Sequence, residues 1–217
     1  MQRQGEPGVG RARFAGQVEN GTFFGKSILI LIRPSRTIDG FDLNLMTSEV
    51  SRTDIFEHTR QRALRLLENG GSRTEVLTCL VTGAELAAGE GAVASILVLD
   101  RDGLLRNGAS PNLPRDYLDA IDKLRPDPAV GTCAAAAATG NVVITPDFHA
   151  DDKWAELRHL PLALGFTGAW SMPILDASSK VLGTFGTYFR DRREPSPEEV
   201  DGIEGLAAVA ALALADD

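Results

Sequence analysis

The chain contains very little cysteine and histidine. Among its 217 residues there are three histidines and two cysteines, Cys79 and Cys133, which lie far apart in the sequence. Such a pair forms neither a disulfide framework nor the closely spaced ligand set of a zinc site. The scarcity favours a protein of the reducing cytoplasm and predicts no metal centre.

Long apolar runs are also missing. The longest early run, "ILILI" at 28–32, is far shorter than the roughly 20 residues that span a bilayer. Arg33 and Pro34 follow it, and they do not form the cleavage site that ends a signal peptide. A net charge of −8 further argues against nucleic acid and against an anionic membrane surface as partners.

No catalytic constellation is visible in the sequence. It has no spacing typical of a Ser-His-Asp triad, no glycine-rich phosphate loop before a lysine, and no zinc pattern. We therefore expect a protein that is not an enzyme.

Residues 1–53 differ from the rest of the chain. They are rich in glycine and arginine, show no sustained hydrophobic period, and hold one short strand-like run at 27–32. We expect these residues to form a poorly ordered N-terminal arm. Patterned sequence begins shortly after Met46, so a translation start at Met46 is a further hypothesis.

Three long helices are expected, two after this arm and one at the C-terminal end. The first, "TDIFEHTRQRALRLLENGG", has Thr53 as its N-cap and ends on glycine. The second begins with a capping box formed by Ser72 and Glu75, in which each side chain pairs with the other residue's backbone N–H. A second capping box, Ser196 and Glu199, begins the last helix.

Short strands with β-branched residues lie between these helices. The segment "AVASILVLD" returns as a hairpin through Asp102 and Gly103, "NVVIT" follows later, and a second hairpin ends in "VLGTFGTYF". Adjacent strands joined by tight turns indicate an antiparallel sheet with helices beside it, an α+β fold.

Shorter helices are expected between the two hairpins. They cover 113–124 and 131–140, the latter with Thr132 as cap and Gly140 as stop, and the segment "DDKWAELRHL", which Pro161 would interrupt.

Two glycines flank Phe185 in the last strand. Gly183 and Gly186 weaken a strand, so their presence indicates that something comes close to its surface. That neighbour is either a ligand or a helix packed tightly on the sheet.

The sequence resembles a GAF domain, the small-molecule-binding sensor module of bacterial signalling proteins. The resemblance covers about residues 72–215 and rests on "SILVLDRDG", "VGTCAAAAATGNVVITPDFHADDKW" and "LGFTGAWSMPILDASSKVLGTFGTYF". It implies a PAS-related α+β fold with a central antiparallel sheet, helices on both faces, and a ligand pocket under the short helices. We expect residues 54–217 to form this domain. One departure is Ala134, which stands where close relatives usually carry glycine.

Five residues are candidates for lining the pocket: Cys133, Asp147, Trp154, Trp170 and Phe185. Cys133 lies in the first turn of a short helix, where the helix dipole favours a thiolate, but a free cysteine is more commonly a small buried apolar residue. The two tryptophans fit either an aromatic pocket wall or the core, and the core is favoured for Trp170.

The sequence does not identify a cofactor. Some GAF sensors hold haem, but His149 and His159 lie where exposure to solvent is the commoner role, so haem is not expected. The acidic side chains beside His149, including Asp151 and Asp152, could bind a hard cation, although aspartates there more often cap a helix.

We therefore expect a GAF-type sensory or regulatory domain that binds an unidentified small molecule and acts in signal transduction, with a separate signalling partner. One alternative is a thiol-dependent reductase of free methionine sulfoxide. That reaction needs a resolving thiol near the attacking one, whereas Cys79 is expected across the sheet from Cys133. The other alternative is a dimerisation scaffold without a ligand.

A homodimer through the terminal helices is the expected assembly. The last helix has one apolar stripe and a second apolar flank, formed by Val200, Ile203, Ala207, Ala210 and Leu214 and by Leu206, Val209 and Ala213. This apolar surface is wider than one sheet face needs, and a two-fold helical bundle would cover the remainder.

Overall fold

The computed structural model describes residues 50–215, and these residues belong to one compact unit. The expected N-terminal arm, apart from its last four residues, and the proposed start at Met46 lie outside the described residues. The elements follow in the order α1 (Arg52–Glu68), α2 (Arg73–Ala88), β1 (Val93–Leu99), β2 (Leu105–Ala109), α3 (Arg115–Ala120), α4 (Thr132–Thr139), β3 (Val143–Thr145), η2 (Asp152–Trp154), α5 (His159–Ala163), β4 (Gly168–Leu175), β5 (Val181–Phe189) and α6 (Pro197–Leu214). Within residues 50–215, no helix is both long and apolar enough to span a membrane.

The five strands form a single sheet in the order β2-β1-β5-β4-β3, and every neighbouring pair is antiparallel. β5 lies at the centre, because it continues the hairpin from β4 and also pairs with β1 along its other edge. The predicted α+β fold with a central antiparallel sheet is confirmed.

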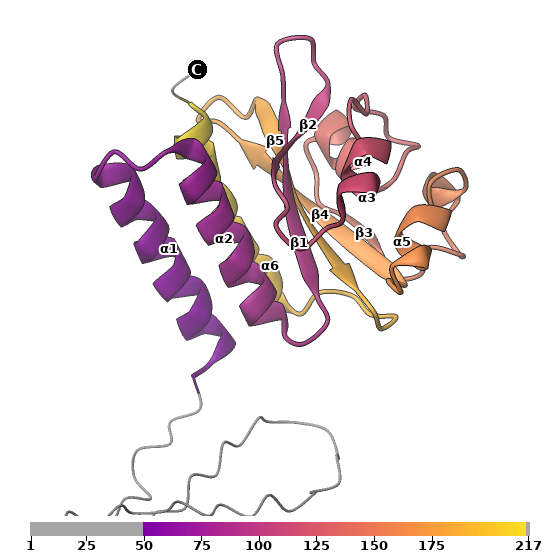
Figure 1. The fold of residues 1–217 in the computed structure, drawn as a ribbon, viewed down its shortest axis with the longest axis horizontal. Coiled ribbons are helices and arrows are strands. Elements are labelled where there is room, and N and C mark those ends of the chain that lie inside the picture. Colours follow the sequence, from indigo (N-terminus) through magenta and orange to yellow (C-terminus); the bar gives the residue numbers. More distant parts are fainter. Residues whose placement is uncertain (1–49, 216–217) are drawn as a thin grey trace, which may run out of the picture. The chain divides into compact units, whose positions relative to one another are not determined.

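Three long helices form a layer on one face of the sheet: α2 and α6 pack against the strands, and α1 packs on these two helices (Figure 1). α1 and α2 form an antiparallel pair beside α6, which packs against β4 and β5. The core on this face includes the fully buried side chains of Leu77, Leu80, Ile96, Trp170, Phe185 and Leu206. Most of the apolar surface of the domain is buried here.

Both apolar flanks of α6 are used within this single chain. Leu206, Val209 and Ala213, which were expected to be spare surface for a partner, are each no more than 6% exposed. They belong to the same core cluster as the other stripe of α6. The stripe is wide because α6 contacts β4 and β5 on one side and α1 and α2 on others, so it is apolar on more than one side.

Shorter segments cover the opposite face of the sheet. α3, α4, η2 and α5 lie on this side, and Figure 1 shows α3, α4 and α5 grouped beside the sheet away from α1. The helix expected at 113–124 ends at Ala120. Lys123 then takes a left-handed φ of 65°, and Leu105 donates its N–H to the Leu124 carbonyl at 2.9 Å. The helix ends early because the residues that follow it form backbone hydrogen bonds with the start of β2.

Two helix caps differ from the sequence prediction. Ser51 and not Thr53 caps α1, because Ser51 forms a reciprocal capping box with Asp54. Gly131 and not Thr132 precedes α4, with φ 52° and ψ −176°, a conformation that glycine adopts without steric cost. The Thr132 side chain is directed to the sheet, where its Oγ1 accepts a hydrogen bond from the Ser171 hydroxyl at 2.9 Å.

The segment "DDKWAELRHL" does not form one helix. Asp152–Trp154 is a single 3₁₀ turn capped by Asp151, and a separate short helix, α5, contains Pro161 as its third residue. Proline is tolerated in a first turn because the N–H that it lacks has no intrahelical partner there. The capping boxes of α2 and α6 and the Gly140 stop of α4 are confirmed.

A buried ion pair joins the sheet to the helical layer. The Arg193 guanidinium donates two hydrogen bonds to the Glu199 carboxylate, at 2.6 and 2.8 Å, and lies 3.6 Å from the centre of the Phe189 ring. Arg52 approaches the same carboxylate at 3.9 Å and donates its Nε–H to the Ala87 carbonyl at 2.9 Å. The end of β5, the start of α6, the start of α1 and the end of α2 therefore meet at one carboxylate.

Candidate functional site

A small polar cluster lies between α4 and the centre of the sheet. The Cys133 thiol is 3.2 Å from the Ser171 hydroxyl, which in turn donates to Thr132. Gly186 of β5 lies directly beneath: a Cβ built at this position would approach Cys133 Sγ to 3.0 Å and Ser95 Oγ to 3.2 Å. Gly186 therefore allows α4 to pack closely on the sheet.

Gly183 has a different neighbour. A Cβ at this position would collide with the backbone carbonyl oxygen of Leu97 on the adjacent strand β1. Close packing of strand on strand, and of helix on sheet at Gly186, accounts for the two glycines around Phe185. Of the two neighbours that the sequence left open, a ligand or a closely packed helix, the structure places a helix at Gly186, and at Gly183 the neighbour is a strand.

Cys133 is a buried thiol in this arrangement. Its side chain is 7% exposed, and burial raises the pKa of the thiol above its usual range. The position in the first turn of α4 does not produce a thiolate, because desolvation outweighs the favourable helix dipole. Cys79 packs with the three long helices on the opposite face, so no second thiol lies near Cys133.

Both tyrosines of the chain lie at the edge of this cluster. Tyr117 of α3 donates its hydroxyl to Tyr188 of β5 at 3.0 Å, and the two rings meet edge to face with centroids 6.0 Å apart. Burial raises the pKa of each phenol above its usual range. The pair is therefore neutral and links α3 to the sheet.

Trp154 covers the cluster from the η2 turn. Its ring is 4% exposed and lies 4.3 Å, centroid to centroid, from the Phe148 ring. A cavity of about 20 Å³ lies among Trp154, the two tyrosines and Cys133, bounded also by apolar side chains of β1, α3 and the segment before α4. This volume is on the order of a single water molecule.

The Trp154 indole Nε1 is a buried polar atom beside this cavity, and it has no hydrogen-bond partner within the described part of the chain. The hydroxyls of Ser95 and Thr184 are also buried, and they lie next to Tyr188 and Cys133. Thr184 and Ser95 lie on β5 and β1, on the strand face that carries Gly186. An unpartnered buried donor costs about 1–3 kcal/mol, so the Trp154 N–H marks a place where an acceptor would bind favourably.

Asp147 lies apart from the cavity. One of its carboxylate oxygens accepts the His149 backbone N–H at 2.9 Å and the other is 3.2 Å from Arg192 Nε. His149 and His159 are both exposed. Asp151 caps η2 and pairs with Lys153 at 2.8 Å, and residues 50–215 contain no group of three or more acidic, histidine or cysteine residues that could hold a metal ion.

Trp170 and Phe185 lie on the face of the sheet opposite to Cys133 and Trp154. Both are 1% exposed and belong to the core beneath the long helices. The structure thus brings Cys133 and Trp154 together and separates them from the other three candidates. Tyr117, Tyr188 and Ser171 were missed, although the single polar residue among the apolar ones in "WSMP" could have marked the face that carries Ser171.

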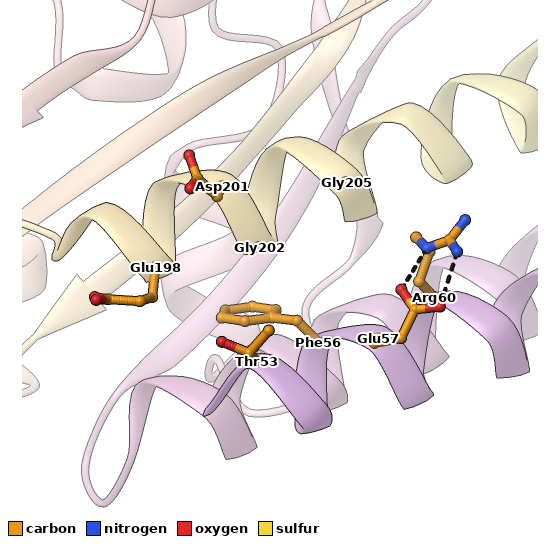
Figure 2. Close-up of a pocket in the computed structure, with 8 residues that line it drawn as sticks. All are labelled: Thr53, Phe56, Glu57, Arg60, Glu198, Asp201, Gly202 and Gly205. Atoms are coloured by element: carbon orange, nitrogen blue, oxygen red, sulfur yellow. Dashed lines mark hydrogen bonds and ion pairs between the residues drawn. The ribbon is translucent and has the colours of Figure 1, made fainter. Parts of the chain in front are cut away.

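A second, larger groove lies between α1 and α6 (Figure 2). It has a volume of about 320 Å³, and the Phe56 ring lies against Gly202, where a Cβ would collide with it. Its polar groups are exposed carboxylates and the Glu57–Arg60 ion pair at 2.8 Å. None of the buried unpartnered polar atoms found in residues 50–215 lines this groove, so the α4 site remains the better candidate.

Comparison with known proteins connects this site to a family. The family model for the GAF domain matches residues 72–215. A methyl sulfide methyltransferase-associated sensor from Methanosarcina acetivorans is 33% identical over 157 residues, and the match covers 72% of this chain but only 16% of that protein.

Solved structures show the same fold. The GAF domain of a phosphoenolpyruvate-protein phosphotransferase from Coxiella burnetii has a TM-score of 0.61 at 16% identity, covering 76% of this chain and 95% of that one. A free methionine-R-sulfoxide reductase from Neisseria meningitidis has a TM-score of 0.56 at 12% identity, covering 76% of this chain and 88% of that one. The matched family model, which covers most of the described residues and all five strands, shows that this chain belongs to the GAF domain family.

Proposed function

We propose that this GAF sensor domain binds a small molecule in the cavity between α4 and the sheet, and that it acts in signal transduction. The observation that carries the proposal is the Trp154 indole, which is buried beside this cavity with its Nε1–H unpartnered. Small-molecule sites are typically apolar and aromatic with a few placed polar groups. The lining of this cavity has that composition.

A ligand larger than one water requires movement of the covering segments. The cavity holds about 20 Å³, and η2 and α5, which follow one another over this face, have three and five residues. Such short elements open at lower cost than long helices. We therefore propose that the ligand enters by displacing the segment around Trp154.

A reductase acting on methionine sulfoxide is less well supported. Burial raises the pKa of the Cys133 thiol, and Cys79 lies on the other face of the sheet. The attacking thiol would be protonated and would have no resolving thiol within reach. We therefore infer that the domain senses and does not catalyse.

Replacing Trp154 by phenylalanine tests the ligand site. Trp154→Phe removes the unpartnered N–H but keeps an aromatic ring, so we expect about tenfold weaker binding of the small molecule released from the protein purified from its own cells. The affinity is measured by calorimetry after identification of that molecule by mass spectrometry. Trp170→Phe is the matched control: it removes the same kind of unpartnered N–H on the opposite face and should leave the affinity unchanged. Equal affinity in all three proteins, or no released molecule, would contradict the proposal.

Association of two copies through the helical layer is also proposed. Val50 and Leu86, exposed by 67% and 68%, line a groove of about 280 Å³ between α1 and α2. Leu86→Glu is expected to halve the mass measured by light scattering at micromolar concentration, because a charge cannot be buried there unpaired. Glu90→Gln, at an exposed position near the end of α2, is the control. A wild-type protein that is already monomeric would remove both the dimer and the scaffold function from consideration.

The signalling partner is proposed to be a separate protein. This chain spans 16% of the sensor from Methanosarcina acetivorans, so most of that protein lies outside the matched region. The low cysteine content favours the cytoplasm as the place where this partner is met.

A further inference from the structure

The α4 cavity is bounded entirely by uncharged side chains. The residues that line it come from β1, β5, α3, α4 and the segments around them, and none of them is Asp, Glu, Lys, Arg or His. The three lining groups that can ionise at all are Cys133, Tyr117 and Tyr188. Burial raises the pKa of each, so that all three are neutral at physiological pH.

Two cationic side chains on this side of the sheet, Lys153 and Arg192, are paired with carboxylates outside the cavity. Lys153, the neighbour of Trp154, lies 2.8 Å from the Asp151 carboxylate, and Asp151 also accepts the Thr145 hydroxyl at 2.6 Å. Arg192 is paired with Asp147. A charged ligand in the cavity would therefore be removed from water without gaining an opposite charge, which is strongly unfavourable.

The hydrogen-bonding groups that remain free favour an acceptor on the ligand. The Trp154 indole, which lines the cavity, can only donate. The N-terminus of α4 also lines the cavity, through Gly131 and Thr132, and has no side-chain cap. Its partial positive charge, about half an elementary charge at most, complements an acceptor dipole but does not neutralise a full anion.

From these observations we propose that the site selects a compact, uncharged molecule that carries a hydrogen-bond acceptor, such as a carbonyl or sulfoxide oxygen. This inference rests on the proposed function and specifies the chemical class of its ligand. It excludes amino acids and nucleotides, whose ionised groups would find no counter-charge among the side chains that line the cavity. The acceptor would take the Trp154 N–H, and the apolar remainder would contact Leu97 and the aromatic rings.

The experiment uses matched probes and the indole signals of the full chain. Dimethyl sulfoxide and acetamide are the uncharged probes, acetate and methanesulfonate are anions of similar size, and methylammonium is the cation. Each is titrated at constant ionic strength into ¹⁵N-labelled protein, and the two indole N–H resonances are assigned with Trp154→Phe and Trp170→Phe. We expect the uncharged probes to shift the Trp154 resonance saturably, with half-saturation in the millimolar range, and the charged probes to bind at least about 100-fold more weakly.

Each other outcome overturns the inference in a recognisable way. Saturable shifts of the Trp154 resonance by acetate or methylammonium, at concentrations similar to those of the uncharged probes, would reject the uncharged class but leave the ligand site in place. If no probe shifts this resonance saturably, both the inference and the proposed site fail. A linear drift of both indole resonances together is a solvent effect and counts as no binding.

Discussion

Glu199→Ala is expected to lower the free energy of unfolding by about 3 kcal/mol. Glu199 is 2% exposed and accepts two hydrogen bonds from Arg193 and one from the Ser196 backbone N–H, at 2.6, 2.8 and 2.8 Å. Removing one partner of a buried ion pair leaves the other uncompensated, at a cost of about 3–5 kcal/mol. We expect a loss at the lower end of this range, because the Arg193 side chain is 31% exposed and its guanidinium can be hydrated once the carboxylate is gone.

The measurement is urea unfolding followed by circular dichroism. Glu204→Ala is the control, because Glu204 is exposed on the same helix, and its effect should stay within about 0.5 kcal/mol. Glu199→Gln removes the charge but keeps the side-chain volume. Its loss of unfolding free energy should therefore fall between the losses for Glu199→Ala and Glu204→Ala. A loss below about 1 kcal/mol for Glu199→Ala would show that the ion pair does not hold the β5–α6 connection.

The same carboxyl group predicts a pH dependence of stability. Burial alone would raise the pKa of Glu199, but the hydrogen bonds from Arg193 and Ser196 outweigh it, and the pKa lies below its usual value. A folded-state pKa below the unfolded value of about 4.3 means that this stabilisation is complete above that pH and is lost as the pH falls through the folded-state pKa. The stability difference between wild type and Glu199→Gln should therefore be largest above about pH 5 and shrink on acidification.

Trp170→Ala is expected to cost about 3–5 kcal/mol of unfolding free energy. Trp170 is 1% exposed on the β4 face that packs against α6, and its removal leaves a cavity in the larger core. Urea unfolding with an unchanged m-value measures the loss, and Trp170→Phe, which fills most of the volume, should recover most of it. If Trp170→Ala instead retained wild-type stability and weakened ligand binding, Trp170 would belong to the ligand site, which is the role that the sequence reading ranked below the core.

Most of the fold could be predicted from the sequence, whereas much of the site could not. Capping boxes such as Ser72 with Glu75, glycine stops and the Asp102-Gly103 turn are local signals, and they gave the elements in their correct order. The site depends on which face of the sheet α4 covers. Both faces of the sheet are buried, so β4 is an almost continuous buried run without a polar face. The sequence pattern therefore does not tell that Trp170 and Ser171 point to opposite layers.

The two layers on the sheet differ greatly in the length of their helices. One layer consists of helices of 17, 16 and 18 residues, each begun by a capping box, and the other of segments of six, eight, three and five residues. In terms of amide hydrogen exchange, we expect the short segments to open by local fluctuation and the long helices to exchange mainly when the whole domain unfolds. If the proposed ligand enters beneath the short segments, we expect α1, α2 and α6 to keep their shape while it binds and leaves, so that a change in their packing reports only events that reach them through the sheet.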